Sequence, residues 1–501
     1  MAPIVGSESR TKIVCTLGPV SRDAETLRGM LRAGMDVARI NFSHGTHAEH
    51  AATIETVRRV ADSEGATVAV LGDLQGPKLR VGEVGAAPIP LREGDHLTLT
   101  AEADCASDGA LHVPHPEVIA AAEPGDVILL ADGAMELTVE ERVATDLVCV
   151  VVVGGQLRSH AGLALIRRRS GDGERLGRRF PALTPKDRED ARFALDQGID
   201  YLALSFVRTA ADIAALRDLA ASDKPGVEIG IMVKIEKREA IERIDEILAC
   251  VDAVMIARGD LGVEVSAEEV PVHQKAIIRK CNRLGIPVIT ATQMLESMID
   301  HPRPTRAEVS DVANAIIDGT DAVMLSAETA IGRYPIEAVR TMARIASTAE
   351  SRMPPQGDDT GFADVSHRHP ITDAISDATA RVAGDLGARL IVTSTWSGYT
   401  ARQVAKERPE VPIVAITPNE TTRRRLALSW GVTPLCVPEE QGTDAMLEEA
   451  ACAVLAHGLA ERGDLIVLTG GIPLGGGRTN FLKVHRLECA EGRGDRGREA
   501  N

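Results

Sequence analysis

A lysine and two carboxylates follow two neighbouring apolar runs of this chain. Lys234 and Glu236 come directly after the run Ile229–Val233, and Asp260 follows the run Ala253–Ala257. Each run has the length of a buried strand, and the sequence between them is helix-like. If the strands are neighbours in a parallel sheet, the three side chains face one mouth. Two carboxylates are too few to enclose Ca²⁺ but suit Mg²⁺, which keeps positions for water and substrate oxygens. An ammonium beside that ion would stabilise a transferring phosphoryl group or an enolate.

The composition is that of a globular protein with more than one domain. The 501 residues are too many for one core, and 44% are hydrophobic while only 2% are aromatic. A net charge of −17 opposes nonspecific binding to nucleic acid or anionic membranes. No apolar run approaches the roughly 20 residues that span a bilayer, and the first residues lack a signal-peptide pattern, so we expect a cytoplasmic protein. The eight cysteines form no C-x-x-C pair, which indicates neither a zinc site nor a disulfide framework.

Eight short apolar runs alternate with helical patterns over much of the chain. The runs are Lys12–Thr16, Asp36–Ile40, Thr67–Leu71, Tyr201–Phe206, Ile229–Val233, Ala253–Ala257, Pro287–Ala291 and Ala322–Leu325. Helical stretches lie between most of them, including Ala24–Ala33, Ala48–Ser63, Asp187–Gln197, Arg238–Leu248, Val272–Leu284 and Arg306–Asp318. Eight such units predict a (β/α)8 TIM barrel, whose active site lies at the C-terminal ends of the strands. Polar residues gather there: Arg39, Asn41, Ser43, His44, Asp73, Ser205, Glu236, Asp260, Thr292, Ser326 and Glu328.

Two further segments interrupt or follow the barrel, which we place at residues 1–81 and 182–350. Residues 82–181 read as an inserted β-barrel lid domain, with strands at 97–100, 127–130, 135–139 and 147–153. An inserted domain at a barrel mouth is well placed to exclude water. Residues 351–490 begin with a linker and continue as an open α/β domain, with a helix at 371–386 and strands at 390–393, 413–416, 434–437 and 465–468. Residues 491–501 are a polar tail.

With these motifs in order, the chain resembles the pyruvate kinase family over nearly its whole length. The matching stretches are Lys12–Pro19, Arg39–Gly45, Asp73–Lys78, Lys234–Glu236, Ala257–Gly262 and Ala291–Met298. The resemblance implies transfer of a phosphoryl group from phosphoenolpyruvate to ADP, giving pyruvate and ATP at the end of glycolysis. The family usually forms tetramers, so we expect a homotetramer.

The resemblance also assigns roles to residues. Glu236 and Asp260 would hold Mg²⁺, or Mn²⁺, while Lys234 neutralises charge on the transferring phosphoryl group and steadies the enolate. Arg39 would grip the phosphate with its planar guanidinium. The remaining assignments are the backbone at Gly259 and Asp260 for the substrate carboxylate, Thr292 and Ser326 for substrate or the protonating water, and Asn41, His44, Arg80 and Lys186 for the nucleotide. An alternative for Lys186 is a simple position in the first turn of an exposed helix.

The chain departs from the family at the monovalent-cation site. Many members hold potassium with oxygens equivalent to those of Asn41, Ser43, Asp73 and a threonine, and carry a glutamate in the following loop. Here Leu74 replaces that threonine and Lys78 that glutamate. A lysine ammonium could supply the charge of potassium, so we hypothesise a potassium-independent enzyme. The alternative is that Lys78 is a solvated loop residue.

Two other segments bear on turnover and regulation. The return strand of the lid, at residues 159–165, lacks the lysine and asparagine typical of the family and precedes the basic stretch Arg167–Glu174, which is either a phosphate contact or a solvated loop. In the C-terminal domain, two loops suggest a site for a phosphorylated effector, either a sugar phosphate or a nucleotide, with candidate residues Thr393, Ser394, Thr395, Ser397, Thr400 and Arg478. Competing interpretations are a metal-dependent aldolase or lyase, and a catalytically impaired relative that kept the fold for binding or regulation.

Overall fold

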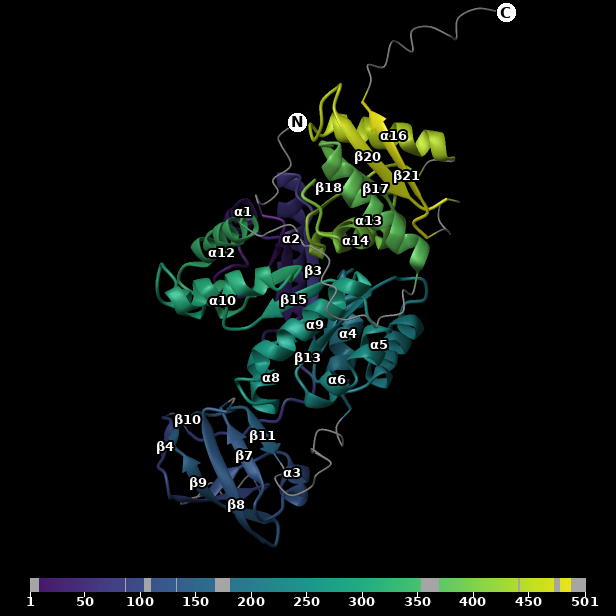
Figure 1. The fold of residues 1–501 in the computed structure, drawn as a ribbon. Coiled ribbons are helices and arrows are strands. Elements are labelled where there is room, and N and C mark those ends of the chain that lie inside the picture. Colours follow the sequence, from purple (N-terminus) through teal and green to yellow (C-terminus); the bar gives the residue numbers. More distant parts are fainter. Residues whose placement is uncertain are drawn as a thin grey trace, which may run out of the picture.

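The chain forms three domains stacked along one axis. The structure, a computed structural model, describes residues 9–85, 87–102, 110–131, 133–166, 181–352, 369–439, 442–472 and 478–487. The β-rich lid and the C-terminal α/β domain lie at opposite ends of a central barrel (Figure 1). Within the described ranges, no helix combines the length and the apolar character needed to cross a membrane. The predicted polar tail, the basic stretch Arg167–Glu174 and most of the predicted linker lie outside the described residues.

Eight parallel strands close into the central barrel, in the order β1-β16-β15-β14-β13-β12-β3-β2. They are β1 (Lys12–Thr16), β2 (Val37–Asn41), β3 (Ala69–Asp73), β12 (Tyr201–Leu204), β13 (Gly230–Ile235), β14 (Ala253–Ala257), β15 (Val288–Ala291) and β16 (Ala322–Leu325). Each overlaps one of the eight predicted runs, which confirms the TIM-barrel fold class. The runs are continuous because parallel strands are buried on both faces, here by side chains inside the barrel and by helices outside.

The helices of the barrel domain differ in how they begin, and several of them have side-chain caps. They are α1 (Ala24–Ala33), α2 (His47–Glu64), α4 (Pro185–Asp196), α5 (Ala210–Asp223), α6 (Arg238–Glu242), α7 (Ile244–Leu248), α8 (Arg258–Glu264), α9 (Val270–Leu284), η3 (Glu296–Ile299), α10 (Arg306–Ile317), α11 (Ala327–Ala330) and α12 (Pro335–Glu350). Thr46, Thr184 and Thr305 start α2, α4 and α10 with reciprocal capping boxes. The predicted single helix over Arg238–Leu248 is wrong: Arg243, at φ −110° and ψ 24°, separates two short helices.

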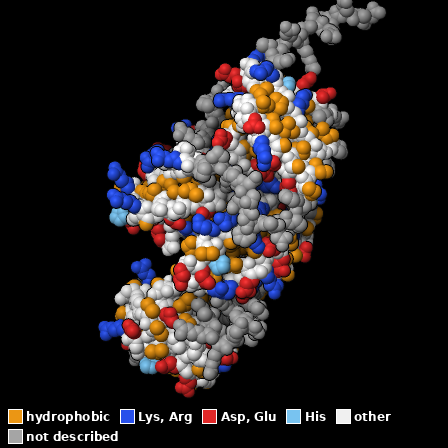
Figure 2. Space-filling view, in the orientation of Figure 1, with side chains coloured by type: hydrophobic (Ala, Val, Ile, Leu, Met, Phe, Trp, Pro, Cys, Tyr) orange, Lys and Arg blue, Asp and Glu red, His pale blue; other side chains and the backbone are white. Residues whose placement is uncertain are grey.

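The lid is a curled mixed sheet inserted after β3. Its elements are β4 (Ile89–Leu91), β5 (His96–Thr100), β6 (Ala110–His112), α3 (Pro116–Ala121), β7 (Val127–Leu130), β8 (Met135–Val143), β9 (Asp146–Val153), β10 (Gly155–Leu157) and β11 (Leu163–Ile166). Six strands pair in the order β11-β7-β8-β9-β5-β6, and β10 pairs with β4. The four predicted lid strands are β5, β7, β8 and β9. Figure 2 shows a notch between the lid and the barrel.

The C-terminal domain is a five-stranded sheet with helices on its faces. Its elements are α13 (Pro370–Asp385), β17 (Leu390–Ser394), α14 (Tyr399–Ala405), β18 (Ile413–Thr417), α15 (Glu420–Arg425), η4 (Leu426–Leu428), β19 (Val432–Cys436), α16 (Thr443–Ala456), β20 (Leu465–Gly470) and β21 (Phe481–Arg486). The strand order is β19-β18-β17-β20-β21. The sequence predicted the first four strands but not β21, an edge strand antiparallel to β20 whose residues are mostly part-exposed.

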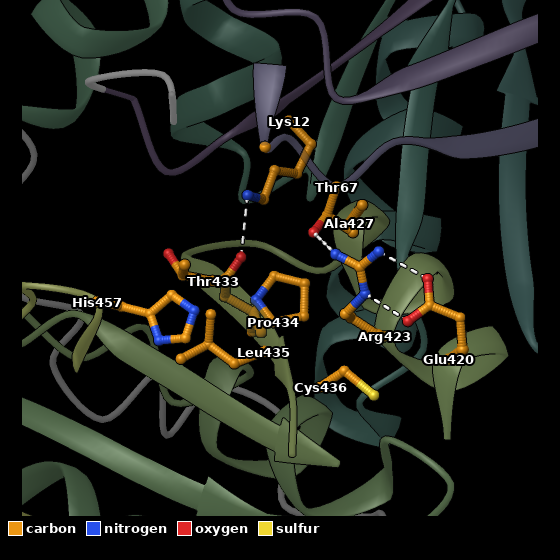
Figure 3. A pocket seen from close by; sticks show the side chains of 12 residues that line it. Lys12, Thr67, Glu420, Arg423, Ala427, Thr433, Pro434, Leu435, Cys436 and His457 are labelled. Carbon is orange, nitrogen blue, oxygen red and sulfur yellow. Dashed lines mark hydrogen bonds and ion pairs between the residues drawn. The ribbon is translucent and has the colours of Figure 1, made fainter. Parts of the chain in front are cut away.

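The short helix η4 of the C-terminal domain closes the N-terminal end of the barrel. Ala427 and Leu428 are buried in the same apolar cluster as the barrel-interior residues Val14 and Leu71. The Tyr201 hydroxyl, at the start of β12, donates to the Arg425 carbonyl at 3.1 Å. Beside this contact, a cavity of about 330 Å³ lies between the two domains (Figure 3). Because η4 fills one end of the barrel, the open mouth is the end that faces the lid.

Shortening the buried leucine of η4 should weaken the packing of η4 against the N-terminal end of the barrel. We expect Leu428→Ala to lower the free energy of unfolding by about 2–5 kcal/mol, because a fully buried leucine is replaced by a cavity. Urea unfolding followed by tryptophan fluorescence measures this, since Trp430 lies two residues away and is itself buried.

A matched control is Leu386→Ala in the same domain, where the leucine is 51% exposed. It should change the unfolding free energy by no more than about 0.5 kcal/mol. Equal losses in the two variants would contradict the role assigned to η4.

Candidate active site

The lysine and carboxylates predicted from sequence meet at the mouth that faces the lid. Strands β13 and β14 are parallel neighbours, with Lys234 opposite Met255. Lys234 lies near the end of β13 and Glu236 directly after it, while Asp260 lies in the first turn of α8, directly after β14. The predicted neighbouring strands therefore exist.

The Lys234 ammonium lies within reach of three oxygen-bearing side chains. Its Nζ atom is 2.8 Å from Glu236 Oε1 and 3.4 Å from Asp73 Oδ1, and it donates to Ser205 Oγ at 2.9 Å. Burial disfavours the charged lysine, but the carboxylates of Asp73, Glu236 and Asp260 outweigh it and raise the pKa of Lys234 above its usual value. The lysine is therefore a fixed positive charge at neutral pH and not a free amine.

A second cation shares the buried carboxylate of Asp73. Arg39 Nε donates to Asp73 Oδ2 at 2.7 Å, and Arg39 Nη1 donates to Thr16 Oγ1 at 2.8 Å. Asp73 is only 1% exposed, so it joins two cations from β2 and β13 in a dry setting. The sequence analysis did not single out Thr16, although it ends β1 as the other polar residues end their strands.

The two candidate metal ligands differ in electrostatic setting. Burial raises the pKa of Glu236, despite its contact with Lys234 and the N–H of Phe206, which donates to its Oε2 at 2.8 Å. Burial acts in the same direction on Asp260, but Lys78 and Lys234 outweigh it and lower the pKa of Asp260. Neighbouring carboxylates with pKa values pushed apart are typical of catalytic sites.

The donor set fits a small divalent cation. Glu236 Oε1 and Asp73 Oδ1 are buried, and neither accepts a well-aligned hydrogen bond from a described residue. Hard carboxylate oxygens are the ligands that Mg²⁺ prefers. In the described part of the chain, no three His, Cys, Asp or Glu side chains cluster as a complete metal cage. A site with few protein ligands leaves coordination positions for substrate and water.

The loop after β15 supplies a hydroxyl beside these carboxylates. The Gly259 N–H donates to Thr292 Oγ1 at 2.9 Å, which ties this loop to the start of α8. Thr292 and Gln293 both have positive φ, 72° and 55°. Such strain in non-glycine residues is concentrated at functional sites. Ser326, at the end of β16, directs its N–H to Glu328 Oε2 at 2.7 Å.

The nucleotide candidates fall into two places. Lys186 donates to the Phe42 carbonyl at 2.7 Å, which brings it beside Asn41 and His44 at the end of β2. Lys186 also pairs with Asp190 one turn along α4 at 2.6 Å and is 51% exposed. Arg80 instead lies at the base of the lid.

Arg80 and the potassium-site residues make their own contacts. Arg80 Nη1 donates to the His160 carbonyl of the lid return segment at 2.9 Å. Asn41 Oδ1 accepts from the Ser43 N–H at 3.1 Å. Lys78 Nζ donates to Asp260 Oδ1 at 2.9 Å. The lysine that the sequence placed with Asn41, Ser43 and Asp73 therefore contacts a candidate metal ligand.

The effector candidates lie around the turn from β17 into α14. Thr393, Thr395 and Thr400 are buried, whereas Arg478 is exposed. The Thr479 hydroxyl donates to Thr400 Oγ1 at 2.9 Å, which brings the segment of Arg478 beside this turn. Ser394 ends β17 and Ser397 lies in the turn itself. Residues 473–477 of the glycine-rich loop lie outside the described residues.

Comparison with known proteins identifies the family. Residues 8–339 match the family "Pyruvate kinase, barrel domain" and residues 373–485 match "Pyruvate kinase, alpha/beta domain". The chain is 46% identical to the pyruvate kinase of Geobacillus stearothermophilus over 490 residues, which cover 97% of this chain and 82% of that protein. It is 45% identical to pyruvate kinase 2 of Synechocystis sp. over 497 residues, 97% of this chain and 80% of that one. The chain therefore belongs to the pyruvate kinase family, the phosphotransferases of glycolysis.

Proposed function

We propose that this chain transfers the phosphoryl group of phosphoenolpyruvate to ADP at the barrel mouth that faces the lid, and does so without potassium. One observation carries the proposal: the buried carboxylate of Asp73 holds Arg39 and Lys234 together at the strand ends. Two fixed cations a short distance apart suit a phosphoryl group whose charge is spread over several oxygens. A barrel that only bound a neutral ligand would have no use for this pair.

The side chains of the mouth divide the work of the transfer. Arg39 would bind the phosphoryl oxygens with the N–H groups of its guanidinium that remain available, since Asp73 and Thr16 hold the plane of the group through Nε, Nη2 and Nη1. Lys234 stabilises negative charge during transfer and on the enolate oxygen that remains. Thr292 and the Gly259 N–H lie together where the substrate carboxylate is expected. Thr292 and Ser326 are the candidates that order the water from which the enolate takes its proton.

Glu236 and Asp260 would hold the divalent cation, Mg²⁺ or Mn²⁺. When bound there, the ion supplies positive charge that polarises substrate oxygens. The nucleotide phosphates are received on the side of Asn41, His44 and Lys186. Arg80 lies apart from them at the base of the lid, and closure of the lid would bring it to the nucleotide and exclude water from the reaction.

Lys78 supports the proposal that potassium is not required. Its ammonium lies on Asp260, and Leu74 stands where potassium-dependent relatives carry a hydroxyl. An ammonium delivers one compact positive charge to the mouth, as a potassium ion would. The charge is covalently attached to the chain, so its presence does not depend on the ionic composition of the medium.

We further propose that residues 351–490 form a regulatory domain whose turn at Thr393, Ser394, Thr395, Ser397 and Thr400 binds a phosphorylated effector together with Arg478, and that the active form is a homotetramer. The hydrogen bond between Thr479 and Thr400 supports the effector site, because it brings the two loops to one place.

Replacing the central lysine tests the activity. Protein, phosphoenolpyruvate, ADP and Mg²⁺ should yield ATP, and Lys234→Met should lower kcat by about 10²–10³ because a preorganised charge is removed. Lys224→Met is the control: Lys224 pairs with Asp196 on the surface at 2.7 Å, away from the mouth, and its loss should leave the rate unchanged. If the wild-type protein forms no ATP with or without potassium, the proposed activity is wrong.

Exchange of two residues tests potassium independence. In tetramethylammonium buffer, the wild-type rate should lie within about twofold of the rate in potassium. Leu74→Thr/Lys78→Glu should become potassium-dependent, with about tenfold or greater stimulation, because it loses the fixed ammonium and regains an oxygen ligand. Leu74→Thr alone keeps Lys78 and should stay independent. A wild-type enzyme that loses most of its rate without potassium contradicts the proposal.

A further inference from the structure

Four aspartates form a ring at the N-terminal end of the barrel, opposite the active site. Each lies directly before one of four strands, β2, β12, β14 and β16, which are every second strand around the barrel. The four are Asp36, Asp200, Asp252 and Asp321. We call them the aspartate ring. Their spacing around the barrel follows its eight-stranded symmetry and not the spacing along the chain.

Each aspartate is joined to the preceding strand by a reciprocal pair of hydrogen bonds. The carboxylates accept backbone N–H groups of Ile13, Val70, Ile231 and Val288 at 2.9, 2.7, 2.8 and 2.9 Å. The backbone N–H of each aspartate donates in return to the carbonyl of the same residue, at 2.9 to 3.0 Å. The ring therefore ties the strands in pairs: β1 with β2, β3 with β12, β13 with β14, and β15 with β16.

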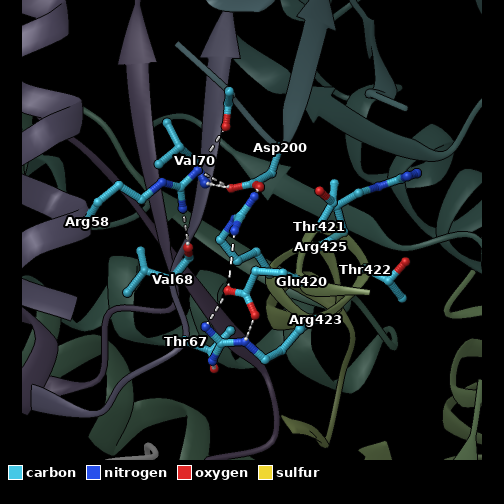
Figure 4. Close-up of polar contacts among 12 residues, drawn as sticks. Arg58, Thr67, Val68, Val70, Asp200, Glu420, Thr421, Thr422, Arg423 and Arg425 are labelled. Carbon is cyan, nitrogen blue, oxygen red and sulfur yellow. Dashed lines mark hydrogen bonds and ion pairs between the residues drawn. The ribbon is translucent and has the colours of Figure 1, made fainter. Parts of the chain in front are cut away.

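The C-terminal domain supplies cations to three of the four carboxylates. Arg424 Nε donates to Asp200 Oδ1 at 2.8 Å, and Arg408 Nη1 donates to Asp321 Oδ1 at 3.0 Å. Arg425 lies 3.7 Å from Asp252. The fourth carboxylate, Asp36, pairs with a lysine of the barrel itself, Lys12, at 3.5 Å. Cations of the barrel helices also reach two ring members, as Arg58 does for Asp200 (Figure 4).

The strands that donate to the ring carry the active-site groups at their other ends. β1 ends in Thr16 and β3 in Asp73. β13 carries Lys234 as its second-last residue and is followed by Glu236, while β15 ends in Ala291 and is followed by Thr292. These strands have four to six residues, so the ring lies only about 13–20 Å from the chemistry along each strand.

We propose that Arg408, Arg424 and Arg425 are positioning residues for the reaction. Through the aspartate ring they fix the register of β15, β3 and β13, and with it the placement of Thr292, Asp73 and Lys234. Removing one partner of a buried charge pair leaves the other charge uncompensated. Asp200 is completely buried, and Arg424 donates to its Oδ1 atom, whereas Arg58 and the Val70 N–H share its Oδ2 atom. Loss of Arg424 would leave Oδ1 without its cation, so that the carboxylate could turn and weaken the hydrogen bond from the Val70 N–H. The assignment of catalytic roles in this inference rests on the proposed function.

The matched variants are Arg424→Met and Arg423→Met, which change neighbouring residues of α15. Arg423 contacts Glu420 and the Thr67 hydroxyl but none of the ring aspartates. We expect Arg424→Met to lower kcat/KM for phosphoenolpyruvate by about tenfold, with the larger part in kcat, because transition-state contacts are displaced. Arg423→Met should stay within about twofold of wild type. Arg424→Lys, which keeps the charge but not the fork, should recover part of the loss.

Hydrogen–deuterium exchange of the peptide that contains Val70 gives a readout independent of activity. Exchange at Val70 should be about tenfold faster in Arg424→Met than in Arg423→Met, because its hydrogen bond to Asp200 opens more often. Arg408→Met provides the same test at Val288, should the first variant fold poorly. Unchanged exchange at both positions overturns the inference, as does a loss of rate that the urea midpoint accounts for entirely. Absence of activity in the wild-type protein would overturn the proposed function instead, and the exchange data would still decide the anchoring.

Discussion

The buried carboxylate of Asp73 is the interaction on which the active site depends. A carboxylate that is 1% exposed is stable in charged form only if cations compensate it, and here Arg39 and Lys234 do so from opposite sides. The same constraint works in reverse, because two cations at one mouth would repel each other without an anion between them. Asp73 thus keeps both charges in place before any substrate arrives. Preorganisation of this kind is the main source of electrostatic catalysis.

The barrel places Asp73 between its cations through the order of its strands. Arg39 lies on β2, which pairs with β3, while Lys234 lies on β13, two strands beyond β3. Three strands that carry these groups are thereby fixed by ladder hydrogen bonds, and a closed barrel has no free edge along which a strand can slip. Precision at the mouth is therefore a property of the whole cylinder. It does not come from the loops, which are the more mobile parts of most proteins.

The sequence revealed the barrel and the mouth because both depend on local pattern. Buried parallel strands are continuous apolar runs, and a polar residue at the end of such a run marks the active face. The predictions from sequence failed, or were not made, where the structure depends on local backbone geometry or on contacts between residues far apart in the chain. The break at Arg243 divides one expected helix, and strands as short as β10 carry too few residues for a periodic signal. The aspartates of the ring are visible before their strands, but their partner Arg408 lies 87 residues from Asp321, and no pattern links the two. The contact of Lys78 with Asp260 was missed for the same reason, since the two are 182 residues apart.

The contact between Lys78 and Asp260 also shows how the lid is attached to the barrel. The segment that leaves β3 for the lid is anchored at Leu74, whose carbonyl accepts from the Ser205 hydroxyl at 2.7 Å. That hydroxyl in turn accepts from the Lys234 ammonium. Gly76, at φ +68°, lies so close to Ser205 that a Cβ there would come within 2.9 Å of the serine Cβ. The chain therefore crosses the active site before it enters the lid. A lid anchored to the Lys234 ammonium and to a candidate metal ligand cannot move as a unit without disturbing both, so its hinge has to lie beyond Lys78.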